Sequence, residues 1–206
     1  MSFLKSSTSF TRYRVVDEVP SSLWMELPDK LKHFAMKDID ELPEERGWGW
    51  VSFEDMLDVE WHENPPQKGA EYMTFALRVD TRRVPPAVVK KHLGLALKSE
   101  ELKVKAAGKT FVSRERKKEL KENVMFVLKK RFLPIPAEFQ VIWNMNVGTV
   151  YIASVQPKLL ELFEEYFVHS FGLHLEQLTP YGLATRFLPE AELDLLDNVE
   201  PTSFRM

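Results

Sequence analysis

The sequence predicts an α+β fold, in which an antiparallel sheet with flanking helices is built from the two ends of the chain and a basic helical hairpin projects between them. Three observations predict it. Strand-like alternation of apolar residues occurs before residue 80 and again after residue 138, and helical spacing fills the stretch between. Positive charge is concentrated in that same stretch. We therefore expect residues 1–81 and 138–206 to form the core and residues 82–137 to form an inserted basic tip.

The first part of the chain predicts two strands and a helix. Residues 9–16 alternate and are rich in aromatic and β-branched side chains, as is typical of a strand. A helix follows Pro20, and Pro28 is expected to kink it or to begin it. Two glycines within residues 47–50 indicate a tight, aromatic-packed turn that leads into a strand at 51–53.

Residues 64–69 are rich in proline and polar residues and predict a loop. The alternation at 72–79 is the cleanest strand pattern in the chain. One face of this strand is expected to carry Met73, Phe75, Leu77 and Val79.

The middle of the chain predicts two helices joined by a loop. Pro85 and Pro86 open the first helix, since proline is tolerated in a first turn, and Arg82 and Arg83 are expected to enter it. Residues 104–110 are small and basic and predict a loop. Ser113 is placed to cap a second helix that runs to about residue 131.

The last part of the chain returns to strands. Alternation at 139–145, a turn at 146–148 and a return strand at 149–155 predict a β-hairpin. Pro157 then begins an amphipathic helix, and Gly172 ends it. A strand at 173–178 and a short helix in the acidic stretch 190–200 complete the expected elements.

Composition bounds the class of protein. The chain has 206 residues, of which 44% are hydrophobic, so there is ample material for a packed core. It contains no cysteine, which excludes disulfides, thiolate metal sites and a cysteine nucleophile. We find neither a signal peptide nor an apolar window long enough to span a bilayer, and expect a soluble, cytoplasmic protein without a membrane partner.

The charges separate along the chain. Residues 82–131 hold sixteen Lys and Arg against five Glu, a balance of +11, whereas the rest holds twelve against twenty-six acids, a balance of −14. A positive field of this kind attracts polyanions, of which nucleic acid is the commonest. The alternative is a pair of solvated helices whose lysines only confer solubility.

The second helix of the basic stretch carries the clearest candidate site. On a helical wheel, four of its cations form one ridge that can follow a phosphate backbone: Arg114, Lys118, Lys121 and Lys129. Cations at the helix end are favoured by the helix dipole alone, and the aromatic residue after them can stack on bases or pack in a core. The candidate nucleic-acid-binding residues are Lys103, Lys105, Lys109, Arg114, Lys118, Lys121, Lys129, Lys130, Arg131 and Phe132.

No catalytic motif is present, and we expect a protein that is not an enzyme and holds no cofactor or metal. The E-x-K spacing of one nuclease class occurs at Glu115 and at Glu119, but on a helix residues two apart diverge by about 200°. The acids of residues 38–46 are most simply a solvated loop, and the histidines lack ligand spacing. A metal-dependent exonuclease is therefore the weakest hypothesis.

The chain resembles the RdgC family of bacterial recombination-associated proteins. The resemblance is diffuse but collinear over residues 3–185, and lies in the segments 3–5, 47–50, 84–90, 120–124 and 130–132 and in the hairpin around Trp143. It implies a nucleoid DNA-binding protein without sequence specificity that restrains the RecA recombinase and forms ring-shaped dimers around duplex DNA.

By position in that family, Arg131 matches a tip arginine, and Phe132 or Leu133 matches an aromatic finger. Some family members are labelled exonucleases, which no residue of this chain supports. The chain is shorter than its relatives, so an open dimer and a monomer remain as alternatives to a closed ring. A module whose basic hairpin docks on an acidic protein partner is the second hypothesis for its function.

Overall fold

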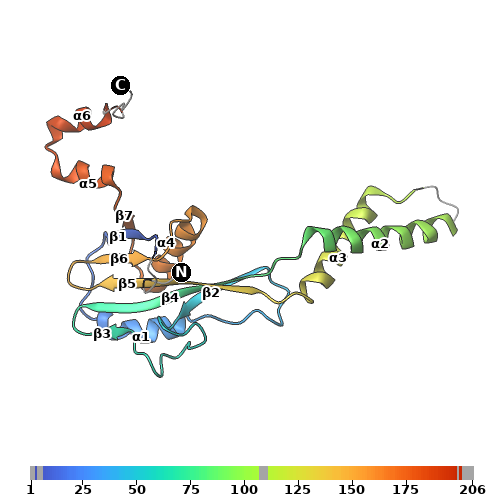
Figure 1. The fold of residues 1–206 in the computed structure, drawn as a ribbon, viewed down its shortest axis with the longest axis horizontal. Coiled ribbons are helices and arrows are strands. Elements are labelled where there is room, and N and C mark those ends of the chain that lie inside the picture. Colours follow the sequence, from blue (N-terminus) through green and yellow to red (C-terminus); the bar gives the residue numbers. More distant parts are fainter. Residues whose placement is uncertain (1–2, 4–6, 107–110, 199, 201–206) are drawn as a thin grey trace.

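The computed structural model describes residues 3, 7–106, 111–198 and 200 of the chain. It is an α+β fold: a seven-stranded antiparallel sheet carries helices on one face and a helical hairpin that stands away from it (Figure 1). The fold class predicted from the sequence is therefore confirmed. No helix among these residues is long and apolar enough to cross a membrane.

The sheet runs in the order β2-β4-β5-β6-β1-β7, with β3 beside β4. Its long central pair, β4 and β5, is in continuous register from Tyr72 opposite Asn144 to Thr81 opposite Ile135. The strands are β1 (Thr11–Val15), β2 (Arg46–Val51), β3 (Gln67–Lys68), β4 (Tyr72–Thr81), β5 (Ile135–Asn144), β6 (Thr149–Ile152) and β7 (Leu175–Gln177).

Helices α1 (Leu23–His33) and α4 (Pro157–Phe171) cover one face of the sheet and pack against each other. Trp50, Trp143 and Phe163 are fully buried between them and the strands. The Trp50 indole donates a hydrogen bond to Ser170 Oγ at 2.8 Å, which satisfies its buried N–H. This aromatic layer is the core of the molecule, and we call the sheet with its covering helices the body.

The basic hairpin consists of α2 (Pro86–Ala106) and α3 (Arg114–Lys129). It leaves the sheet after β4 and returns at β5, so it occupies the place of the turn between these paired strands. Figure 1 shows it extending well beyond the body, while α5 (Pro180–Phe187), a 3-10 turn (Glu190–Glu192) and α6 (Leu193–Asp197) extend from the β7 edge of the sheet. The basic stretch of the chain thus projects from the acidic remainder in space, as it is set apart from it in sequence.

The sequence predicts a turn at residues 47–50, and this is wrong. The segment is the middle of strand β2. Gly49 permits a close backbone approach instead. A Cβ on Gly49 would lie 2.3 Å from the Cα of Met36, because the chain after α1 runs alongside the strand. That approach is fixed by two hydrogen bonds, from Trp50 N to Phe34 O at 3.0 Å and from Met36 N to Trp50 O at 2.9 Å.

Smaller differences concern the ends of elements. Helix α2 continues to Ala106, so the loop expected at 104–110 is wrong for its first three residues, and 107–110 lie outside the described part. The expected loop 64–69 contains the short strand β3, and α1 begins before Pro28 rather than at it. Helix α5 lies where no helix was expected.

Candidate nucleic-acid interface

Helix α3 begins as the sequence predicts. Ser113 Oγ accepts a hydrogen bond from the backbone N–H of Arg116 at 3.2 Å, the standard way to satisfy a free amide at a helix start. Of the α3 side chains only Leu128 is buried. The charged side chains of α3 are therefore presented mostly to solvent.

A groove of about 650 Å³ runs between α3 and the acidic loop, by which we mean residues 38–45. We call it the α3 groove. Three of the four cations of the predicted ridge line it, Lys118, Lys121 and Lys129, whereas Arg114 does not. The structure thus brings together the part of the ridge nearest the body, and it adds an opposite wall containing Glu45.

Two of these lysines are paired with acids. Lys129 Nζ lies 2.6 Å from Glu45 Oε1, and Lys118 Nζ lies 3.9 Å from Glu122 Oε1. Exposed pairs of this kind contribute about 0–1 kcal/mol, so a phosphate can replace either acid at small cost. Lys121 makes no ion pair with any described residue and needs no such exchange.

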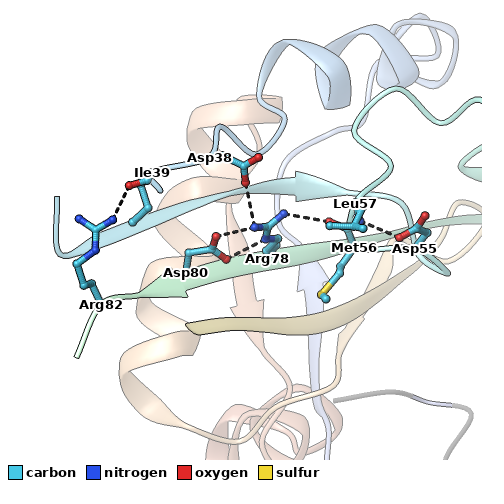
Figure 2. Close-up of polar contacts among 8 residues, drawn as sticks. All are labelled: Asp38, Ile39, Asp55, Met56, Leu57, Arg78, Asp80 and Arg82. Atoms are coloured by element: carbon cyan, nitrogen blue, oxygen red, sulfur yellow. Dashed lines mark hydrogen bonds and ion pairs between the residues drawn. The ribbon is translucent and has the colours of Figure 1, made fainter. Parts of the chain in front are cut away.

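The acidic loop is held in place by a buried arginine. The sequence predicts that Arg82 enters the first helix, and this is wrong. Its side chain is buried and turns back to the acidic loop (Figure 2). It donates to the carbonyl oxygens of Ile39 at 2.7 Å, Asp40 at 3.0 Å and Glu44 at 3.2 Å, and also to that of Leu42. The Arg82 guanidinium is buried and hydrogen-bonded inside the protein, so it is not available to a phosphate.

A second arginine anchors the start of the loop. Arg78 donates two hydrogen bonds to Asp80, at 2.8 and 2.7 Å, and one to Asp38 at 3.0 Å (Figure 2). The hydrogen bonds to Asp80 raise the pKa of the Arg78 guanidinium, whereas burial acts to lower it. The side chains of Arg78 and Asp80 are only 10% and 1% exposed, so this charged pair is enclosed on the sheet.

The tip of the hairpin has its own ion-pair network. Arg116 contacts Glu100 of α2 at 2.7 Å and Glu119 at 2.9 Å, and so ties the two helices together. The hydrogen bond from Arg116 lowers the pKa of the Glu100 carboxyl. The acids therefore neutralise only a few of the cations on the hairpin. Those that form no ion pair within the described residues are Arg83, Lys90, Lys91, Lys98, Lys103, Lys105, Arg114, Lys117, Lys121, Lys130 and Arg131.

The remaining candidates occupy different places. Lys103 and Lys105 lie in the last turn of α2 rather than in a loop, and Lys105 and Lys117 line a depression of about 260 Å³. Arg131 lines an apolar groove between the two helices. Lys109 lies outside the described residues.

The sequence predicts that the aromatic residue after the cations at the end of α3, Phe132, stacks on bases or packs in a core. Phe132 is half-buried, whereas the next residue, Leu133, is 72% exposed. The aromatic ring available beside the cations is Phe126, with the ammonium of Lys130 at 4.5 Å from its centre. The sequence interpretation missed Phe126, although its spacing of four residues from Lys130 on a helix is a signal that places the two side chains together.

No cluster of three or more metal-ligating side chains occurs in the described part of the chain, and both E-x-K matches lie on α3. In comparisons with models of protein families and with curated proteins, nothing matches this chain.

Proposed function

We propose that this protein binds DNA without sequence specificity, in the manner of the RdgC proteins that the sequence resembles, and that it is not an enzyme. The observation that carries the proposal is the line of Lys118, Lys121 and Lys129 along one groove of α3. Lysine ammonium groups spaced about one or two turns apart on an exposed helix suit the phosphates of a nucleic-acid backbone, which carry affinity but no sequence information.

The arrangement of charge supports binding through the hairpin rather than through the body. Beyond the base of α3, which lies against the acidic loop, the hairpin extends away from the body in Figure 1, so a long polyanion can reach most of it without crossing a repulsive surface. Its unpaired cations outnumber the acids that lie on it. The affinity is therefore expected to fall log-linearly with salt concentration.

In this proposal the protein acts on the nucleoid in the cytoplasm and limits RecA by occupying DNA. Homodimerisation through the hairpin is part of it. The support is apolar exposure: Leu95 and Leu102 of α2 are 57% and 70% exposed, and α2 buries no side chain of its own. A second copy that covers these residues would give the hairpin the core that two helices alone lack.

The proposal is tested by reversing two charges of the groove. We expect the double variant Lys118→Glu/Lys121→Glu to bind duplex and single-stranded DNA more weakly whatever the sequence, and to reduce the salt slope by about 2, one for each lost phosphate contact. Fluorescence anisotropy with labelled DNA across a salt series measures both. Lys158→Glu, an exposed lysine of α4 in the body, is the matched control. Unchanged affinity and slope in the double variant would overturn the proposal.

The second candidate function is docking of the hairpin on an acidic protein. The exposed apolar side chains of α2 favour it, since a phosphate backbone has no use for them. A measurement of DNA binding by the wild-type protein distinguishes this function from the first. If the wild-type protein binds no DNA at low salt, the cations and the apolar residues together define a protein interface.

A further inference from the structure

Phe126 is an aromatic side chain in an unusual place. Phenylalanine is among the residues most often buried, yet Phe126 is 49% exposed and lines the α3 groove. The helix makes its buried contact through Leu128 instead. Packing within the chain therefore does not account for the position of this ring.

One cation contacts the ring and two more line its groove. Lys121 and Lys129 line the same groove, and the ammonium of Lys130 lies 4.5 Å from the ring centre. The Lys130 side chain that makes this contact is itself exposed, so a solute can reach the same π-face. A nucleobase can take the place of the ammonium on the ring, and Lys130 then remains beside it for a phosphate.

The opposite wall restricts what can enter. Pro43 and Glu45 stand across the groove from the helix, and Arg82 fixes their loop by hydrogen bonds to its carbonyl oxygens. The bases of an intact duplex are stacked inside two backbones, and the carboxylate of Glu45 repels a second backbone at this point. An unpaired strand can turn single bases into such a groove.

We propose that the α3 groove is a single-strand site, in which Phe126 stacks on an unpaired base while Lys121, Lys129 and Lys130 hold the adjoining phosphates. The inference rests on the proposed DNA binding and adds a preference within it. Both ligands use the cations of the hairpin, and the unpaired strand alone adds the stack on Phe126. Phe126 is then a binding residue that distinguishes bases from bare backbone.

Three ligands of equal length test the inference at one salt concentration: an unpaired thymidine strand, an abasic strand and a duplex. We expect Phe126→Leu to weaken binding of the thymidine strand about fivefold or more, the loss of about 1 kcal/mol at the low end for one base–aromatic stack. Binding of the abasic strand and the duplex is expected to stay unchanged. Phe126→Trp, which keeps a stacking surface, is expected to retain binding of the thymidine strand.

The same substitution at Phe111, which is 77% exposed on the hairpin but outside the α3 groove, is the matched control. Equal losses for all three ligands, or no loss for the thymidine strand, would overturn the single-strand site while leaving DNA binding intact. A wild-type protein that binds none of the three ligands would overturn both proposals. Thermal melting of each variant shows that the fold is unchanged.

Discussion

The body and the hairpin are held by different forces. In the body, Trp50, Trp143 and Phe163 are fully buried in one aromatic layer between sheet and helices. In the hairpin, α2 buries no side chain and α3 buries only Leu128. Because hydrophobic stabilisation scales with buried apolar area, the body carries the folding free energy and the hairpin adds little to it. The surface of the hairpin is correspondingly free to concentrate charge.

The largest expected effect tests this difference directly. Trp50→Ala removes a ring that contacts Phe75 and Phe171 and a hydrogen bond to Ser170, and should lower the free energy of unfolding by about 3–5 kcal/mol. The hairpin substitution Phe111→Ala should change it by less than about 0.5 kcal/mol. Urea denaturation followed by far-UV circular dichroism measures both. Similar losses in the two variants would show that the hairpin contributes to the global fold.

The next effect concerns the buried charges that anchor the acidic loop. Asp80→Asn leaves the enclosed Arg78 without its main partner and should lower the free energy of unfolding by about 3 kcal/mol. Asp38→Asn is the matched control, since Asp38 is 69% exposed and its pair should contribute about 1 kcal/mol or less. Chemical denaturation compares the two variants. If Asp38→Asn costs as much as Asp80→Asn, the difference in burial does not decide the strength of these pairs.

Local patterns predicted much of the fold. The alternation of β4 and of the β5–β6 pair, the cap at Ser113 and the end of α4 at Gly172 each depend on neighbours in sequence, and each was confirmed. The segment 47–50 was misinterpreted because Gly49 allows a close approach of the Met36 backbone that only the tertiary fold creates. Two nearby glycines are compatible with a turn and with a strand, and the sequence cannot distinguish these cases without the backbone that lies opposite.

The same limit applies to the candidate site. Helical periodicity placed Lys118, Lys121 and Lys129 on one side of α3, and the groove brings them together. The opposite wall at Glu45 comes from a loop far away in sequence, which no periodicity links to α3. Arg82 counts as one more cation in the composition, and only its hydrogen bonds reveal it as a fixed part of the loop.

The smallest expected effect lies at the junction of the two regions, where Glu45 of the body holds Lys129 of the hairpin at 2.6 Å. Glu45→Gln removes the competing carboxylate, so Lys129 is free for a phosphate, and the salt slope of DNA binding should steepen by up to about 1. Affinity at low salt should rise two- to fivefold, about 0.4–1 kcal/mol, the usual range for an exposed pair. Anisotropy titrations across a salt series measure both quantities.

Glu41→Gln is the control, because it removes the same charge from the same loop outside the groove. Equal gains in the two variants would mean that the body acts on DNA through its overall field, and not through this one contact between the two regions.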